Sequence, residues 1–258
     1  MNSNRGFFFR KTLLEDQELK GKFVLDAGCG NGRYSYWAAQ YAERVIGMDL
    51  GDGVESAGKN TTDLNHVQIV QGDIFYPPFI SNCFDIIYSI GVLMHTGDAK
   101  KATTSLVQKL KNSGSITVHV YGKGNFIYEF FDRKIRERTT KLTIPQLQSF
   151  TKRLYKLRRI LEKLYLAEFV NLFIKVDFHP HCIFDWYAAP IATHHTYKEV
   201  EGWFNELNLH VLATNKGKIV LGPKIKTTNK LKLGIIKFIK KIIYPFENIP
   251  VTVKARKL

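Results

Sequence analysis

A glycine-rich turn places the tightest constraint on the fold of this chain. The segment Asp26-Ala27-Gly28-Cys29-Gly30-Asn31-Gly32 follows a short apolar run at 23–26 and precedes a stretch with helical periodicity at 33–43. Glycines at such a point let the backbone turn sharply and let another group approach it closely, which a Cβ atom would prevent. The predicted order of elements is therefore strand, tight turn and helix.

Four further apolar runs have the length and composition of buried strands. They occupy residues 45–49, 67–73, 84–90 and 115–121, with a helical stretch at 99–110 between the last two. Buried strands that alternate with helices are typical of a parallel sheet covered on both faces. Together with a hairpin expected at 210–214 and 218–221, they predict an α/β protein with a doubly wound, seven-stranded sheet.

The alternation of strands and helices stops after Tyr121. Residues 126–138 and 144–173 have helical patterns, and the second of these is very basic. This region is too long for an ordinary crossover connection, so we interpret it as a helical insertion. The expected divisions are a core at 1–121, the insertion at 122–178, the remainder of the core at 179–223 and a basic tail at 224–258.

The net charge of +15 is concentrated in two segments. Residues 123–176 carry +8, residues 224–258 carry +9, and the remainder carries −2. A basic chain attracts nucleic acid or an anionic surface, but a nearly neutral core argues against uniform attraction to nucleic acid. The isolated cysteines Cys29, Cys83 and Cys182 indicate neither a disulfide framework nor a cysteine metal site, so we expect a reducing, cytoplasmic location.

Two carboxylates follow the second and third apolar runs. Asp49 stands 17 residues after Gly32, and Asp73 ends the run at 67–73. The carboxyl ends of parallel strands meet at one edge of a sheet. There Asp49 could accept hydrogen bonds from both hydroxyls of a ribose, and Asp73 could reach an adenine amino group. The pattern therefore favours a nucleoside-containing cofactor.

These segments resemble the successive motifs of class I S-adenosylmethionine-dependent methyltransferases, in particular the UbiE-like, methyltransferase type 11/12 group. The likeness covers about residues 20–121 and comprises, in order, VLDAGCGNGRYS, VIGMDL, VQGDIFYPPF, FDIIYSIGVLMHTGD and LVQKLKNSGSITVHVY. It implies a Rossmann-like fold, S-adenosylmethionine as cofactor and methyl transfer as activity. The insertion would then be a substrate lid.

The resemblance also implies a role for each residue of the first two motifs. Asp26 and Gly28, with the backbone of Gly30, would hold the methionine part of the cofactor. Asp49 would take the ribose hydroxyls, and Leu50 would pack on the adenine. An alternative is a dinucleotide-binding turn, but the third glycine of GCGNGR comes one residue earlier than in GxGxxG, which makes that reading the weaker one.

The third and fourth motifs would complete the cofactor pocket. By the same resemblance, Asp73 would bond the adenine amino group and Ile74 would pack on the ring, while Ser89 and Gly91 would line the pocket near the sulfonium. The fourth run lacks the [DN]PP[YF] segment that grips a planar amide or base nitrogen, and no Pro-Cys follows it. Both absences count against a nucleic-acid base as the methyl acceptor.

A hydroxyl acceptor needs a general base, and histidine is the commonest one. His95 follows the fourth run, in a segment similar to the family's GVLHHTPD, although it could equally fix the turn there. His194 and His195 precede Thr196, which with Glu199 forms a predicted capping box that leaves the histidines unexplained. The other candidates are His119, His179 and His181.

The segment from Asp185 to Pro190 is similar to a DWYSP pattern that we associate with methyltransferases of bacterial surface-polysaccharide and secondary-metabolite pathways. We expect a loop here, in which Asp185, Trp186 and Tyr187 grip a sugar or another polyhydroxylated ring. Buried core aromatics are an equally good interpretation. The cluster His179-Pro180-His181-Cys182 is too compact to supply one metal ion, and we expect no metal.

The two basic segments admit several partners. Residues 231–244 form a cationic amphipathic helix on a helical wheel, which suits either peripheral contact with the inner face of a membrane or docking on the protein's own core. Basic residues of the insertion could recognise an anionic acceptor, bind RNA or simply be solvated. They are Lys152, Arg153, Lys156, Arg158, Arg159 and Lys163.

The sequence thus favours a methyltransferase that acts on a small-molecule acceptor, through a hydroxyl of a sugar, glycan or natural product. An RNA methyltransferase is the first alternative, supported by charge alone. The second is a catalytically silent, cofactor-binding protein at a membrane, against which the intact glycine turn and Asp49 argue.

Overall fold

The computed structural model describes residues 2–124, 126–164, 166–171, 173–177, 179–216 and 250–258. The chain divides into two compact units. Unit 1 comprises the described parts of Met1–Gly122, Thr193–Lys218 and Pro250–Leu258, and unit 2 contains those of Lys123–Ala192. The expected end of the insertion at residue 178 therefore moves to residue 192, and the segment 179–192 belongs with the insertion.

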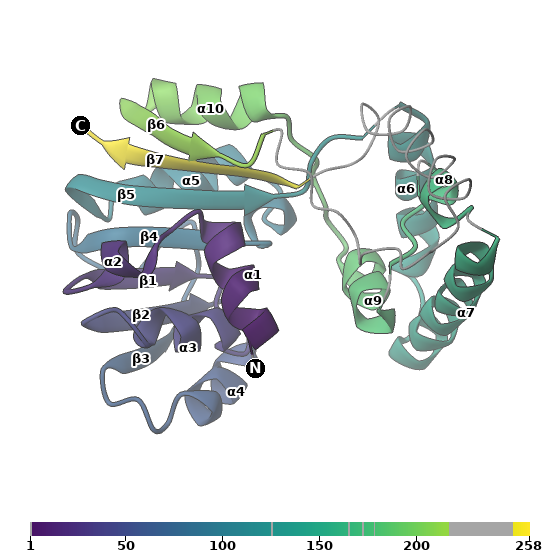
Figure 1. Ribbon diagram of the computed structural model, residues 1–258, viewed down its shortest axis with the longest axis horizontal. Helices are drawn as coiled ribbons and strands as arrows, with labels where there is room; N and C mark the ends of the chain where they lie inside the picture. Colours follow the sequence, from purple (N-terminus) through teal and green to yellow (C-terminus); the bar gives the residue numbers. More distant parts are fainter. Residues whose placement is uncertain (1, 125, 165, 172, 178, 217–249) are drawn as a thin grey trace, which may run out of the picture. The chain divides into compact units, whose positions relative to one another are not determined.

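Unit 1 is built on a seven-stranded sheet with the strand order β3-β2-β1-β4-β5-β7-β6 (Figure 1). Strands β1 to β5 are parallel, whereas β7 runs antiparallel to both of its neighbours. This arrangement confirms the predicted α/β fold. The strands are β1 (Phe23–Ala27), β2 (Arg44–Asp49), β3 (Val67–Gln71), β4 (Phe84–Ile90), β5 (Leu110–Val120), β6 (Leu209–Thr214) and β7 (Val251–Lys257).

Helices cover both faces of this sheet. On one face lie α1 (Asn2–Thr12), α2 (Asp16–Leu19) and α3 (Arg33–Ala39), and on the other α5 (Ala99–Val107) and α10 (Tyr197–Glu206). Strand β4 contributes to the hydrophobic core on each face, because side chains alternate along a strand. Ile86 and Tyr88 pack in the core beneath α1 and α3, and Ile87 packs in the core beneath α5 and α10. Helix α4 (Gly53–Asn60) packs beside β2 and β3.

The C-terminal residues correct one expectation. The expected hairpin paired 210–214 with 218–221, but β6 pairs with β7, at the end of the segment that we took for a basic tail. Lys254 of β7 is buried, donates to the carbonyl oxygen of Leu13 at 3.2 Å and pairs with Glu18. Part of the tail's charge is thus used in folding, while the helix expected at 231–244 lies outside the described residues.

Unit 2 is helical in its described part. It contains α6 (Phe126–Thr139), α7 (Ile144–Lys163), α8 (Ala167–Val170) and α9 (Pro180–Ala188), and both α6 and α7 pack against α9. The helix expected over 144–173 is therefore two helices. Thr143 begins α7 with a capping box to Gln146, and Pro145 stands in its first turn, where its missing N–H costs nothing.

None of the described helices is long and apolar enough to cross a membrane.

Candidate functional site

The turn after β1 is held against β2 by its backbone. The N–H groups of Gly28 and Cys29 both donate to the carbonyl oxygen of Met48, at 2.7 and 3.0 Å. Gly28 has φ +90°, and a Cβ atom on it would lie 2.2 Å from Cγ2 of Val92. Glycine is therefore required at position 28 by the close packing of the segment after β4.

Gly30 is required for a different reason. Its φ is +53°, and no atom lies within 4 Å of the point where its Cβ would stand. Left-handed backbone is costly for most residues but not for glycine. The turn is consequently open beside Gly30, as a backbone that receives a ligand should be.

Asp49 joins the ends of two loops. Its Oδ2 accepts a hydrogen bond from the Gly30 N–H at 2.8 Å, and its Oδ1 accepts one from the Gly51 N–H at 3.0 Å. A carboxylate has about four acceptor positions, so two of them remain for donors such as hydroxyl groups. The half-buried Asp49 thus fits the predicted role at a ribose.

The residues expected around the adenine lie in different environments. Leu50 is 68% exposed and offers an apolar surface, whereas Ile74 belongs to the buried core. Asp73 is half-buried, and its Oδ1 accepts a hydrogen bond from the Phe75 N–H at 2.8 Å, which leaves Oδ2 for another donor. Leu50 and Asp73 can meet a ligand as they stand, and Ile74 supports them from below.

Asp26 supports the turn from beneath. It is buried beneath the turn, where its Oδ2 accepts a hydrogen bond from the Ser35 hydroxyl at 2.7 Å. Burial raises the pKa of Asp26 to about 7, and the charge of Asp49 adds to this, while the Ser35 hydrogen bond partly offsets it. The buried carboxyl group thus joins the strand before the turn to the helix after it.

Ser89 and Gly91 end β4 in different ways. The Ser89 hydroxyl is buried and donates to the carbonyl oxygen of Ala27 at 2.7 Å, so it ties β4 to β1. Gly91 has φ +75°, and its N–H donates to the carbonyl oxygen of His119 at 2.9 Å. Gly91 therefore turns the chain into the short helix η1 (Leu93–His95).

Two of the candidate histidines lie on either side of Tyr121, the residue that follows β5. The ring of His95 meets the Tyr121 ring edge-on with centroids 5.3 Å apart, and the His194 ring lies 5.9 Å from it. The His95 N–H also donates to the carbonyl oxygen of Val92 at 2.8 Å. Because Val92 packs on Gly28, His95 stands beside the turn after β1, and His194 shares its Tyr121 contact.

Two further candidate histidines of unit 1, His195 and His119, have structural surroundings. Nε2 of His195 lies 2.8 Å from the Thr193 hydroxyl, its backbone N–H donates to Tyr121, and its ring packs on Trp203 at 4.9 Å. His119 is buried with Nδ1 2.7 Å from the Thr252 hydroxyl, and burial lowers the pKa of His119 to about 3. His195 holds the returning chain, and His119 joins β5 to β7.

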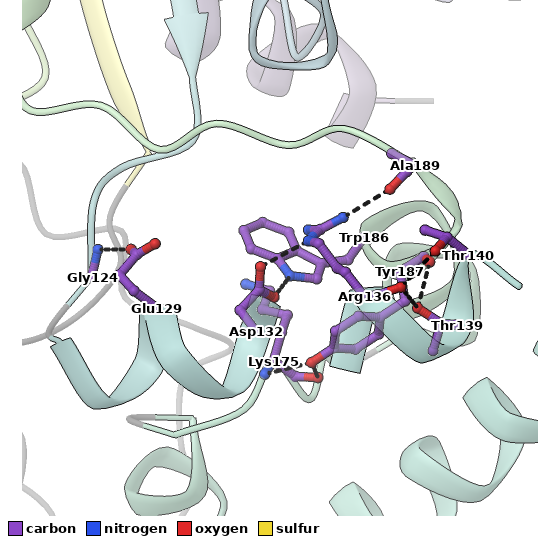
Figure 2. Close-up of polar contacts among 10 residues, drawn as sticks. All are labelled: Gly124, Glu129, Asp132, Arg136, Thr139, Thr140, Lys175, Trp186, Tyr187 and Ala189. Carbon is purple, nitrogen blue, oxygen red and sulfur yellow. Dashed lines mark hydrogen bonds and ion pairs between the residues drawn. The ribbon is translucent and has the colours of Figure 1, made fainter. Parts of the chain in front are cut away.

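Asp185, Trp186 and Tyr187 lie on α9 in unit 2 and not in a loop. Asp185 is exposed, whereas Trp186 and Tyr187 are buried. Figure 2 shows the indole N–H of Trp186 donating to Oδ1 of Asp132 at 2.7 Å, while the Arg136 Nε–H donates to Oδ2 at 2.8 Å. The aromatic pair is part of the packing of α6 on α9, as the core interpretation predicted.

Sequence reasoning missed several of these partners. Tyr121 ends the fifth motif but carried no assigned role, and Thr193 belongs to no motif; only their position between core and insertion could have indicated them. Asp132 and Arg136 do carry a signal, since opposite charges four residues apart on a helix are neighbours. Among the described residues no group of three or more His, Cys, Asp or Glu side chains could hold a metal ion, and the side chain of His181 is not among those described.

Comparison with known families gives a match in the region of this site. A family model described as "Methyltransferase domain" matches residues 25–118. The matched segment contains the turn after β1, Asp49, Asp73, Gly91 and His95. His194 and all of unit 2 lie outside it.

Two curated relatives agree with this match. A protein of Encephalitozoon cuniculi, provisionally named a methyltransferase, is 28% identical over 156 residues, which are 57% of this chain and 68% of that protein. The ubiquinone biosynthesis O-methyltransferase of Coxiella burnetii is 30% identical over 110 residues, 42% of this chain and 47% of the enzyme. The chain thus spans about half the length of the Coxiella enzyme.

A solved structure extends the likeness to the whole chain. A protein of Listeria monocytogenes, provisionally named an S-adenosylmethionine-dependent methyltransferase, has a TM-score of 0.58 and 16% identity, with all of both chains covered. At this level of identity the likeness is one of fold.

Proposed function

We propose that this chain, which carries a class I S-adenosylmethionine-dependent methyltransferase domain, transfers the methyl group to a hydroxyl group of a small-molecule acceptor, a sugar, glycan or natural product. The cofactor is S-adenosylmethionine, which supplies a methyl group activated by a sulfonium. The acceptor class and the catalytic residues are the parts of this function that we propose here.

The residues at the carboxyl edge of the sheet fit this cofactor. Asp49 is fixed by two backbone donors and keeps acceptor capacity for the ribose hydroxyls. The open side of Gly30 leaves room for the methionine part, and exposed Leu50 and half-buried Asp73 are available to the adenine. Asp26 acts through the turn that it supports, and Gly28 through its packing on Val92.

The placement of His95 and His194 around Tyr121 carries the proposal for a hydroxyl acceptor. Methyl transfer to a hydroxyl requires that its proton leave, and imidazole groups accept protons near neutral pH. His95 is one turn from Val92, which packs on the cofactor turn, so a base at this position adjoins the methyl donor. His95 is therefore our first choice as general base, and His194 the second.

His195 and Asp185 have lesser parts in this proposal. His195 would position the segment that carries His194, because it is bonded to Thr193 and packed on Trp203. Asp185 is exposed on α9 and remains a candidate acceptor contact.

A methyl-transfer screen with labelled cofactor tests the acceptor class. The acceptors are nucleotide-sugars, lipid-linked glycans, phenols and bulk RNA, with the methylated atom located by mass spectrometry. O-methylation of a small molecule supports the proposal, whereas transfer to RNA alone or to no acceptor contradicts it.

Substitution of the histidines tests the base. With an acceptor identified, His95→Ala should lower kcat by about 10²- to 10⁴-fold and leave S-adenosylhomocysteine affinity unchanged. His210→Ala is the matched control, because His210 is exposed on β6. If His95→Ala and His194→Ala both retain full kcat, neither histidine is the base.

A further inference from the structure

Helix α7 of unit 2 presents three parallel strips of side chains. The strip at Leu147, Thr151, Leu154 and Arg158 faces the interior, where three of its members are buried and Leu154 is partly buried. The spacings of four, three and four residues are those of one face of an α-helix. They leave more than half of the circumference of α7 for other contacts.

The second strip is entirely cationic. It consists of Lys152, Lys156, Arg159 and Lys163, all exposed and at the same spacings of four, three and four. None of these four side chains forms an ion pair with a residue that the structure describes. The strip therefore carries four uncompensated positive charges.

The third strip is apolar beyond its first residue. Arg153 is followed by Leu157, Ile160 and Leu164, which are 38%, 56% and 59% exposed. The leucines of this segment therefore lie in two environments. Leu154 and Leu161 face the interior, whereas Leu157 and Leu164 face the solvent. Leu157, Ile160 and Leu164 form a solvent-exposed ridge beside the cationic strip.

Among the residues that the structure describes, no acidic side chain neutralises this surface. Glu162 is the one acidic residue of α7, and it accepts from Nε of the buried Arg158 at 2.9 Å. The charge of Glu162 is therefore paired with Arg158 of the inward-facing strip. The outer surface of α7, defined by the second and third strips, is both cationic and apolar.

We propose that this outer surface of α7 docks on an anionic lipid bilayer. Lysine and arginine side chains are attracted to acidic headgroups, and exposed aliphatic side chains gain free energy when they enter the headgroup and acyl boundary. An α-helix of 20 residues is about 30 Å long and can lie flat on such a surface. The adjacent strips supply both contributions along the same length.

The exposed aliphatic ridge favours a lipid bilayer over other anionic partners. RNA and soluble phosphates are bound through charge and hydrogen bonds and gain little from three aliphatic side chains. A soluble anion is also held by cations that converge on one point, whereas these spread along three turns of helix. A bilayer uses both features, and this proposal does not depend on the identity of the methyl acceptor.

Co-sedimentation of the full chain with vesicles tests the proposal. The vesicles contain either phosphatidylcholine alone or equal parts of phosphatidylcholine and phosphatidylglycerol. We expect preferential binding to the second kind. Lys152→Glu/Lys156→Glu/Arg159→Glu should lower the partition coefficient by at least about a hundredfold, since each basic residue lost at an anionic surface removes roughly fivefold and each added carboxylate is repelled.

Leu157→Asn/Ile160→Asn/Leu164→Asn separates lipid from the other partners. This variant keeps every charge, so it should bind the anionic vesicles at least tenfold more weakly and bulk RNA as well as the parent. Lys59→Glu/Lys198→Glu/Arg256→Glu is the matched control, because these exposed cations lie in unit 1. S-adenosylhomocysteine binding and circular dichroism verify that each variant is folded.

Several outcomes would overturn the proposal. If both α7 variants bind vesicles as tightly as the parent, another part of the chain, such as residues 217–249, makes the contact. If the charge reversal abolishes RNA binding and the asparagine variant leaves vesicle binding intact, α7 is an RNA surface. Absence of vesicle binding by the parent would also refute it.

Discussion

The carboxylate of Asp49 bridges the turn after β1 and the loop after β2, since its Oδ2 lies 2.8 Å from the Gly30 nitrogen and its Oδ1 3.0 Å from the Gly51 nitrogen. Nineteen residues separate Asp49 from Gly30. One side chain thus fixes the shape of the turn and, in the proposed function, also presents acceptors to the cofactor. Loss of this carboxylate should remove both contributions together.

Asp49→Ala should weaken S-adenosylhomocysteine binding by about a hundredfold or more, because hydrogen bonds to a charged group contribute about 1.5–3 kcal/mol each. Titration calorimetry measures this loss. Asp52→Asn is the control, since Asp52 is exposed three residues further on and makes no side-chain cap bond to α4. Equal affinity of Asp49→Ala and the parent would remove Asp49 from the cofactor site.

Alanine substitutions at the two glycines of the turn should have different effects, one on stability and the other on cofactor affinity. Gly28→Ala would place Cβ 2.2 Å from Val92 and should destabilise the fold, and the added change Val92→Ala should restore part of that stability. Gly30→Ala meets no atom and costs only about 1–2 kcal/mol for its left-handed backbone, yet it should greatly weaken cofactor binding.

Urea denaturation and calorimetry on the same samples distinguish the two glycine variants. A Gly30→Ala protein that binds cofactor normally would show that the open side of Gly30 receives no part of it.

Asp26 should make stability depend on pH with an unusual sign. Its pKa is raised to about 7 from 3.8, so between pH 4 and 7 the folded state binds more protons than the unfolded state. The free energy of unfolding should therefore fall as pH rises through this range, by up to about 1.4 kcal/mol per pH unit relative to Asp26→Asn.

Urea denaturation of parent and Asp26→Asn at several pH values measures this difference. Asp63→Asn, at an exposed position, should track the parent at every pH. A constant difference between parent and Asp26→Asn from pH 4 to 7 would show that Asp26 is already ionised in the folded protein at pH 4.

The parallel half of the sheet was predictable because its signals are local. The runs that became β1, β2, β3 and β4 are apolar and end at glycines or carboxylates, which is how buried parallel strands end in sequence. Asp49, Asp73 and Gly30 were proposed from the same local signals. The hydrogen bond that Asp26 accepts from Ser35 was not predicted, because Ser35 belongs to the following helix.

The remaining elements depend on contacts that sequence patterns do not show. Strand β7 carries Lys254, Arg256 and Lys257 and has the composition of a basic tail, yet its partner β5 lies more than 100 residues away. A buried strand position for Lys254 could be predicted only if its partners, Glu18 and the carbonyl oxygen of Leu13, were already known. Likewise α9 is held by Asp132 and Arg136 of α6.

The buried pair in unit 2 should show strong non-additivity. Asp132 and Arg136 are both buried, and the carboxylate has the Trp186 indole as its other donor. Arg136→Met leaves that carboxylate without its counter-charge and should cost about 3–5 kcal/mol of stability. Asp132→Asn/Arg136→Met removes both charges, keeps an acceptor for Trp186 and should recover more than half of that cost.

Hydrogen exchange of α6 and α9, together with urea denaturation, locates and measures these changes. Lys134→Met is the matched control, because Lys134 pairs with Glu137 at 2.9 Å on the same helix but both side chains are about half exposed, and such pairs contribute little. Additive costs in the double variant would mean that Asp132 and Arg136 stabilise unit 2 independently of each other.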